Sequence, residues 1–212
     1  MTELYFIRHG QTIINQEGKV NGATVDTPLT AAGISGAQAA GRELATCHFD
    51  HVFVSPQKRA QATAQLVLAN NPVADIQVVE QLHEMAFGDW EGRLIADGKK
   101  DPALRRFFTD PEHYDPSSYH GETFAAVVAR GQAFLQHVVT TYPHQRVLVV
   151  GHGTMLTVTV RSALGASIGE IMTQAQLDNT SISVLQSDNG TDFTLARWND
   201  TSFLTPAIDR LA

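Results

Sequence analysis

Short apolar runs alternate along the chain with longer stretches whose apolar residues recur at helical spacing. The short runs are typical of buried β-strands and lie at residues 4–7, 51–54, 76–79 and 146–150. The periodic stretches predict amphipathic helices at residues 30–44, 56–70, 123–142 and 154–164. Because strands and helices alternate, the pattern favours a parallel sheet with helices on both faces.

Two helix starts can be predicted from capping residues. Thr30 stands before the first periodic stretch, where its hydroxyl suits an N-cap. Ser55 is followed by Pro56, a pair typical of an N-cap and the first helical position. We therefore expect the second helix to begin directly after the strand at residues 51–54.

The pattern changes in the middle and at the end of the chain. Residues 90–120 are rich in Pro, Asp and Gly and predict an insertion of short helices and loops. Residues 181–186 and 193–198 are β-rich runs separated by SDNGTD, which predicts an antiparallel hairpin.

The expected fold is α/β: a three-layer sandwich with a mostly parallel sheet of about six strands, an antiparallel edge and helices on both faces. We expect one domain spanning residues 1–212, with residues 90–120 as a lid insertion within it.

Composition narrows the class of partner. The 212 residues are 43% apolar and 17% charged, as in ordinary globular proteins, and 15 basic against 22 acidic residues give a net charge of -7. No run of Lys or Arg exceeds a pair, which argues against nucleic acid as a partner. An anion must then be held by a local cluster of positive groups.

The expected location follows from the absence of a signal peptide and of a membrane-spanning stretch, and from the cysteine content. The opening MTELYFIRHG has too short an apolar run for a signal peptide, and no stretch approaches the ~20 apolar residues that span a bilayer. Cys47 is the single cysteine, which fits a reducing compartment. We expect a cytoplasmic protein that does not contact membrane. The oligomeric state stays open, with a homodimer among the alternatives.

Two of the predicted strands end in a histidine followed by glycine, in FIRHG at residues 6–10 and VVGHG at residues 149–153. Ligands of open α/β sheets bind at the carboxyl ends of the strands, so His9 and His152 are expected to share one site. The following glycine, Gly153 in the second motif, lets backbone N–H groups approach a ligand closely.

Two arginines add positive charge to the same sheet edge. Arg8 precedes His9, and Arg59 falls in the first turn of a helix, where its side chain leans back toward the strand end. Guanidinium groups beside a helix N-terminus suit a phosphoryl group. A neutral imidazole can attack phosphorus to form a phosphohistidine, and a second, protonated imidazole can donate to the equatorial oxygens.

A leaving alkoxide needs a proton donor at neutral pH. Glu84, in LHEMAFGDWEG, is the best-placed acid, with Phe87 and Trp90 nearby to keep water away. Asp89 and Glu91 are rivals by spacing alone. The chain has no HxxxH or HxH spacing that would favour a metal site, so we expect none.

Five blocks together resemble the histidine phosphatase superfamily, also called phosphoglycerate-mutase-like. RHG with a following Thr12 and Asn15 is similar to its N-terminal signature, and the other blocks are DTPLTAAG, SPQKRAQATA, HEMAFGDWEG and VVGHG. They occur in family order between residues 4 and 155. The short motifs GET at residues 121–123 and WNDTSFL at residues 198–204 are weaker features of the same kind.

The resemblance implies a role for each matched residue. His9 would be the nucleophile, and Arg8, Arg59 and His152 would hold the transferring phosphoryl group. Glu84 would protonate the leaving group and later activate water. The resemblance also implies a phosphate pocket lined by Asn15, Asn21 and Gly22. The family works without a metal, and we expect no cofactor.

Two departures bear on the branch of the family. Gln11 stands where many members have Glu, and the block EMAFGDWEG resembles the phosphatase branch more than the glycolytic mutases. We therefore expect a phosphomonoester hydrolase that acts on a small phosphorylated metabolite through a phosphohistidine. The alternatives are mutase-type phosphoryl transfer and a non-catalytic phosphoester-binding domain.

The segment at residues 90–120 should lie over the pocket and select the leaving group. Its basic pair, Arg105 and Arg106, is expected on a solvated face, with contact to an acidic leaving group as the alternative.

Overall fold

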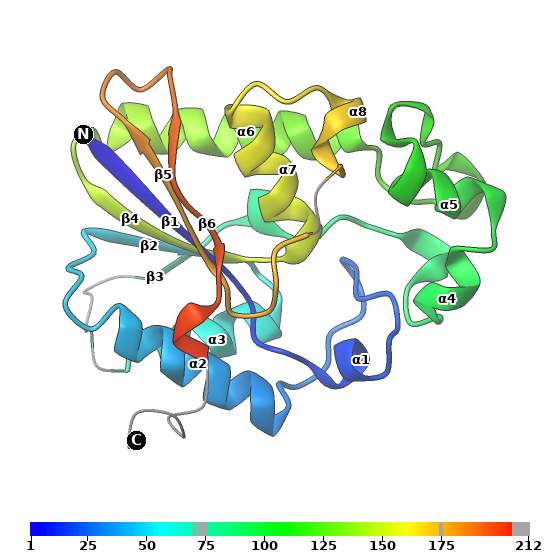
Figure 1. Cartoon of the computed structure of the whole chain (residues 1–212), viewed down its shortest axis with the longest axis horizontal. Helices are drawn as coiled ribbons and strands as arrows, with labels where there is room; N and C mark the ends of the chain where they lie inside the picture. Colours follow the sequence, from blue (N-terminus) through cyan, green and yellow to red (C-terminus); the bar gives the residue numbers. More distant parts are fainter. Residues whose placement is uncertain (70, 72–75, 174–175, 205–212) are drawn as a thin grey trace.

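A mixed β-sheet forms the centre of the protein (Figure 1). The computed structural model describes residues 1–69, 71, 76–173 and 176–204. In this part of the chain the sheet has six strands in the order β3-β2-β4-β1-β5-β6. The strands are β1 (Thr2–Arg8), β2 (His51–Val54), β3 (Ile76–Val78), β4 (Arg146–Gly151), β5 (Ile182–Ser187) and β6 (Thr194–Asp200).

The strand directions agree with the predicted topology. The pairs β1–β4, β4–β2 and β2–β3 are parallel, whereas β5 is antiparallel to β1 and to β6. The predicted mostly parallel sheet with an antiparallel edge is therefore confirmed, and so is the hairpin formed by β5 and β6.

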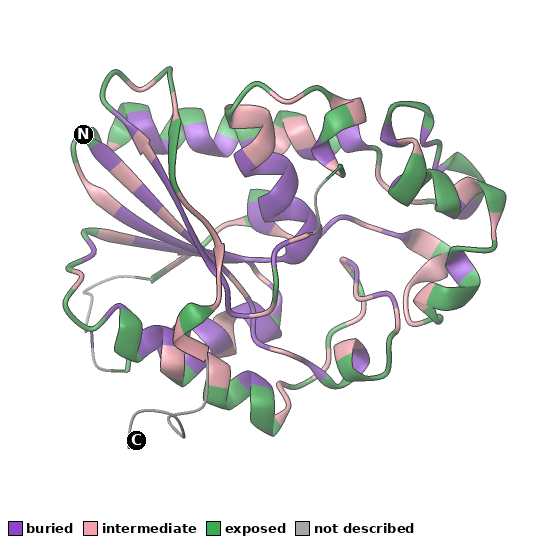
Figure 2. Cartoon of the chain, in the orientation of Figure 1, coloured by how far each residue is buried: buried purple, intermediate pink, exposed green. Residues whose placement is uncertain are grey.

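Helices cover both faces of the sheet, which confirms the three layers (Figure 1). α2 (Ala31–Glu43) and α3 (Lys58–Val67) lie on one face, and α6 (Phe124–Thr141) and α7 (Gly153–Ala163) lie on the other. Successive strand residues point to opposite faces, so Phe6 belongs to the apolar core under α6 and α7, whereas Ile7 belongs to the core under α2 and α3. α7 is buried over most of its length (Figure 2).

The predicted insertion at residues 90–120 consists of short helices joined by loops. It contains α4 (Ile95–Gly98) and α5 (Pro102–Thr109), followed by short 3-10 turns. Asp101 caps α5 by accepting from the backbone N–H groups of its first turn. The insertion lies beyond the carboxyl ends of the parallel strands, to the right in Figure 1, where it can cover a site at that edge.

Most element bounds agree with the predicted ones to within a residue or two, but the start of α3 does not. The prediction of Ser55 as N-cap and Pro56 as first helical residue is wrong, because α3 begins at Lys58 and its N-cap is Gln57. The Gln57 side chain makes no capping bond. The predicted end near Asn70 lies outside the described residues.

The capping oxygen of α3 comes from a distant loop instead. Asp26 accepts from the backbone N–H of Lys58 at 2.6 Å and from that of Arg59 at 3.4 Å. A carboxylate at this place satisfies free N–H groups and complements the helix dipole. Ser55 is thereby released from capping, and its hydroxyl contacts His152.

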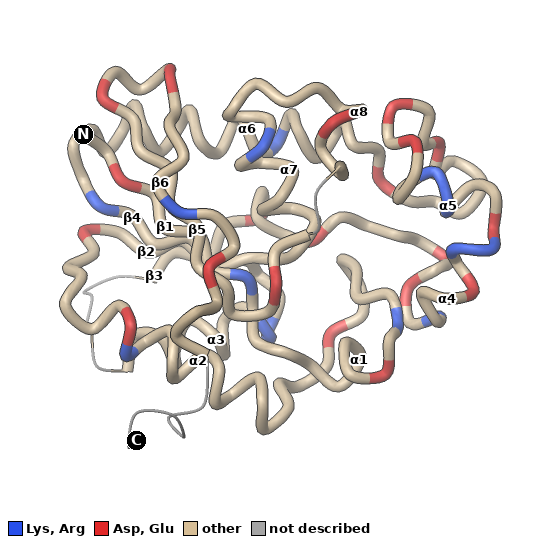
Figure 3. The backbone as a smooth tube through the Cα atoms, viewed as in Figure 1, with Lys and Arg blue, Asp and Glu red and all other residues tan. Residues whose placement is uncertain are grey.

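Two very short helices, α1 (Ile13–Gln16) and α8 (Ile168–Ile171), were not predicted. Each is a single turn closed by a capping box, too short to show a period in the sequence. No described helix is both long and apolar enough to cross a bilayer. Basic positions are dispersed among acidic ones along the chain (Figure 3).

Candidate active site

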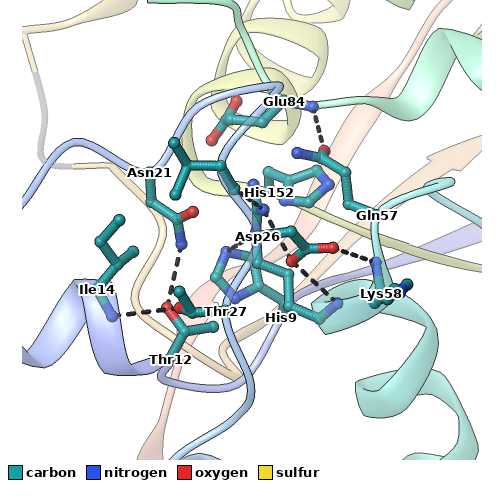
Figure 4. A network of polar contacts seen from close by, with 12 residues as sticks. His9, Thr12, Ile14, Asn21, Asp26, Thr27, Gln57, Lys58, Glu84 and His152 are labelled. Atoms are coloured by element: carbon teal, nitrogen blue, oxygen red, sulfur yellow. Dashed lines mark hydrogen bonds and ion pairs between the residues drawn. The ribbon is translucent and has the colours of Figure 1, made fainter. Parts of the chain in front are cut away.

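Two histidines meet at the carboxyl edge of the central strands. Arg8 at the end of β1 pairs in register with Gly151 at the end of β4, so the next residues of both strands, His9 and His152, are neighbours. Their ring centroids lie 5.1 Å apart, and both side chains are buried (Figure 4). The structure brings them together as the sequence predicted.

The His9 ring is held in one orientation. Its Nδ1 lies 2.8 Å from the carbonyl oxygen of Gly10, which places the ring proton on Nδ1 and the lone pair on Nε2. Nε2 faces Arg59 Nε at 3.3 Å. Burial, together with the charges of Arg59 and Arg8, holds the pKa of His9 well below its ordinary value. The ring is therefore neutral, as a nucleophile must be.

His152 lies behind this ring, with its Nε2 at 2.6 Å from Ser55 Oγ. Burial and the neighbouring Arg59 and His9 hold the pKa of His152 well below its ordinary value. In the ligand-free protein the neutral ring is favoured, so the protonated second histidine expected during phosphoryl transfer stays a prediction. Sequence patterns could not show this, because the shift comes from burial and from charges on other elements.

Arg59 is buried and makes contacts in several directions. Its Nη2 donates to the carbonyl oxygen of Gly22 at 2.8 Å, and its Nη1 donates to that of Val25 at 2.9 Å and to Asp26 Oδ1 at 3.2 Å. The loop at residues 22–26 therefore fixes the guanidinium beside His9. The part that Gly22 plays in these contacts is to accept from Arg59 with its backbone carbonyl oxygen.

Arg8 lies over the N-terminus of α7. Its Nη1 donates to the carbonyl oxygen of Leu177, and a Cβ at Gly153 would lie 3.1 Å from Arg8 Cζ. A larger residue at position 153 would press on the guanidinium. Gly153 thus allows this arginine to lie close to the helix start that follows His152.

The RHG turn packs directly on the start of α2. A Cβ at Gly10 would lie 2.6 Å from the carbonyl oxygen of Gly33, and a Cβ at Gly33 would lie 2.1 Å from that of Gln11. Only glycine allows backbones to approach this closely. Gln11 accepts from the hydroxyl of Thr30, the N-cap of α2, at 2.8 Å, so its side chain has a local structural partner.

Glu84 is held at the N-terminus of α7. Its carboxylate accepts from the backbone N–H groups of Thr154 at 3.0 Å, Met155 at 2.9 Å and Met85 at 2.8 Å. The side chain is buried at 5% exposure, yet it lines the same cavity as Arg8 and His9. The acid is therefore within the site.

The rival acids have other partners. Glu91 accepts from the backbone N–H groups of Ala23, Thr24 and Val25, which ties the acid-bearing segment to the loop around Arg59. Asp89 is directed to His120 on the protein surface. Neither lines the cavity that holds Glu84.

The cavity combines three of the catalytic candidates, Arg8, His9 and Glu84, with part of the lid. Asn15 and Asn21 line it. The Thr12 hydroxyl accepts from Asn21 Nδ2 at 3.1 Å (Figure 4). The same hydroxyl donates to Asn15 Oδ1 at 2.9 Å, so Thr12 fixes both side chains. The lining residues are Arg8, His9, Asn15, Lys19, Val20, Asn21, Glu84, Phe87, Ile95, Leu104, Phe107, Phe108, Thr154 and Gln176.

Two further residues, Gln57 and Asn179, position the site through contacts that the sequence motifs do not predict. Gln57 donates to the carbonyl oxygens of Gly22 and Ala23, and its Oε1 accepts from the backbone N–H of Glu84 at 2.8 Å. It thereby links the Arg59 loop to the acid (Figure 4). Asn179 donates to the carbonyl oxygen of His9 at 2.9 Å.

A partly buried ion pair supports the acid-bearing segment from α6. Arg130 makes two contacts with Glu122, at 2.8 and 3.0 Å, and donates to the carbonyl oxygen of His83 at 2.7 Å. Glu122 also accepts from the backbone N–H of Ala86. The middle residue of the GET motif at residues 121–123 therefore joins α6 to the segment that carries Glu84.

Two imidazoles, two guanidinium groups and a carboxyl group at one sheet edge form the arrangement expected of an α/β enzyme that acts on a phosphoryl group. Among the described residues, no three His, Cys, Asp or Glu side chains lie close enough together to hold a metal ion.

Comparison with known proteins agrees with this class. A family model for the histidine phosphatase superfamily, branch 1, matches residues 4–201. Adenosylcobalamin/alpha-ribazole phosphatase of Escherichia coli is 36% identical over 164 residues, which are 76% of this chain and 79% of that protein. Putative phosphoserine phosphatase 2 of Hydrogenobacter thermophilus is 30% identical over 191 residues, 89% of this chain and 91% of that protein.

The fold is also similar to that of a solved structure. Bacillus stearothermophilus YhfR superposes with a TM-score of 0.89 at 29% identity, covering 97% of this chain and 100% of that chain. The chain belongs to the histidine phosphatase superfamily. The two relatives named above are phosphatases, and phosphohistidine chemistry without a metal is general to the family.

Proposed function

We propose that this chain hydrolyses phosphomonoesters through a phosphohistidine on His9. The observation that carries the proposal is the His9 ring itself, neutral, with Nε2 unprotonated and beside Arg59, in a cavity that also contains Glu84. We assign the catalytic set to the same five residues that the sequence singled out, His9, Glu84, Arg8, Arg59 and His152.

In the first step His9 Nε2 attacks phosphorus, and the bond from phosphorus to the ester oxygen breaks. The protonated carboxyl of Glu84 gives its proton to the departing alkoxide. In the second step the Glu84 carboxylate takes a proton from water, which attacks phosphorus and breaks the bond to Nε2. Phosphate leaves, and His9 and the protonated Glu84 are restored.

Charge stabilisation comes from the groups around His9. Negative charge spreads over the equatorial oxygens of the transferring group, and Arg8 and Arg59 lie where fixed positive donors can balance it. A dianion bound here would also favour proton uptake by His152. Asn15 and Asn21 would complete the oxygen contacts.

The test is a panel of phosphomonoesters assayed for free phosphate and for isomerised ester in parallel. We expect phosphate release without a bisphosphorylated primer. Isomerisation that depends on such a primer would favour the mutase alternative. Binding without turnover across the panel would favour a non-catalytic phosphoester-binding domain.

The other sequence predictions complete the proposal. Residues 1–212 act as one domain, and the family match over residues 4–201 supports this. We propose a cytoplasmic location, and the single cysteine, Cys47, supports a reducing compartment. The homodimer and monomer alternatives can be separated by light scattering.

Ser55 is expected to set the tautomer of His152. The Ser55 hydroxyl accepts from the backbone N–H of Gln57 at 3.3 Å and can donate its single proton to His152 Nε2. The His152 proton then lies on Nδ1, ready to donate to a phosphoryl oxygen. Ser55→Ala should lower kcat about tenfold, since one lost hydrogen bond is worth about 1.4 kcal/mol.

Steady-state kinetics would check this role, with kcat falling more than KM rises. Ser55→Thr, which keeps the hydroxyl, is the rescue variant. If Ser55→Ala lowers the unfolding temperature but leaves kcat intact, Ser55 serves packing alone.

A further inference from the structure

The cavity has two chemically different sides. Arg8, His9 and Glu84 lie on the sheet side. The apolar part of the lining, here called the apolar wall, comes from the lid and the segments next to it: Val20, Phe87, Ile95, Leu104, Phe107 and Phe108. An ester whose phosphoryl group reaches His9 must therefore place its leaving group against this apolar wall.

The basic side chains of the lid do not line the cavity, although Lys99 Nζ lies 5.2 Å from the centroid of the cavity-lining Phe108 ring. Arg106 donates to the carbonyl oxygen of His113, Lys100 pairs with Asp97, and Arg105 is exposed. None of these residues lines the cavity. The alternative in which Arg105 and Arg106 contact an acidic leaving group therefore finds no support.

Little positive charge remains for a second anionic group. Among the described residues that line the cavity, the cationic ones are Arg8 and Lys19. Lys19 Nζ already pairs with Glu17 at 2.7 Å, and Arg8 is placed for the transferring phosphoryl group. A leaving group with its own phosphate or carboxylate would lose hydration here, and no unpaired cationic side chain of the lining would compensate for that loss.

Aromatic packing gives the wall a fixed shape. Phe107 stacks on Phe124 with ring centroids 5.2 Å apart and meets Phe87 edge-on at 5.1 Å. Phe108 meets Phe107 edge-on at 4.9 Å and keeps 36% of its surface exposed. An apolar ligand that covers this exposed ring surface removes it from water, which favours binding.

We propose that the leaving group is an apolar alcohol, best one that carries an aromatic ring, and that bisphosphates and small phosphorylated acids are poor substrates. The inference rests on the proposed function, because it concerns the leaving group of that same reaction. Phe108 is its specificity-determining residue.

Matched alkyl esters test this without changing the chemistry of the leaving oxygen. With the full chain, kcat/KM for phosphate release from 2-phenylethyl phosphate should exceed that from ethyl phosphate and from 3-phosphoglycerate at least about tenfold. Phe108→Ser should reduce the ratio of 2-phenylethyl to ethyl phosphate about fivefold, and Phe108→Leu should retain most of it. Arg105→Ser, on the same helix but outside the cavity, is the matched control and should change neither rate.

The outcomes separate the two proposals. Phosphate release at equal kcat/KM from all three esters, or fastest release from 3-phosphoglycerate, would overturn the apolar leaving group and leave the hydrolase intact. An unchanged ratio in Phe108→Ser would also overturn it. No release from any ester would overturn the hydrolase and this inference together.

Discussion

His9→Ala is expected to lower kcat roughly 10⁴-fold or more on every phosphomonoester, because it removes the atom that accepts the phosphoryl group. The guanidinium groups of Arg8 and Arg59 should still bind the ester, so KM should change much less. Phosphate release measures the rate. Acid-labile radiolabel retained on the protein after a denaturing quench measures the phosphoenzyme, which should be absent from the variant.

The control is His48→Ala, because His48 is exposed and lies outside the cavity. Its rate and its phosphoenzyme should match those of the unchanged protein. Turnover by His9→Ala within tenfold of normal, or a phosphoenzyme that survives in it, would show that another nucleophile acts.

The fold was predictable because each of its main elements carries a strong local signal. Apolar runs in β1, β2 and β4 and the periodic apolar residues of α2, α6 and α7 require no knowledge of neighbours. The meeting of His9 and His152 also follows from local reasoning, since both end parallel strands and such ends share one edge of a sheet.

The start of α3 could not be predicted in this way. Its capping carboxylate, Asp26, lies about 30 positions upstream, and a sequence window around Ser55 contains an equally good local candidate. In the folded protein the Ser55 hydroxyl contacts His152, so Asp26 and not Ser55 caps the helix. A local rule fails here because the serine has a partner within the site.

Supporting contacts were hidden for the same reason. Gln57 has no chemistry of its own, and its importance comes from joining the Gly22 carbonyl to the Glu84 backbone. Glu91 looked like a rival acid because spacing ignores which backbone groups a carboxylate can reach. Identification of such residues needs the packed loops, whereas the reacting groups could be recognised by type.

Glu84→Gln is expected to reduce kcat on alkyl phosphates roughly 10²- to 10⁴-fold, since an alkoxide leaves poorly without a proton donor. The loss should be smaller for bond cleavage in p-nitrophenyl phosphate, whose leaving group needs no proton. Because Glu84 also activates water in the second step, the phosphoenzyme should then accumulate. A stopped-flow burst of nitrophenolate, equal to the enzyme concentration, would measure it.

Asp89→Asn is the matched control, because Asp89 lies five positions along the same segment but contacts His120 at the surface. Its rates on both ester types should be unchanged. Glu84 also accepts from Thr154 and Met155, so Glu84→Gln can lower the unfolding temperature through α7. That structural effect would slow alkyl and nitrophenyl esters alike and give no burst. Dependence of the loss on the leaving group therefore distinguishes proton transfer from support of the helix.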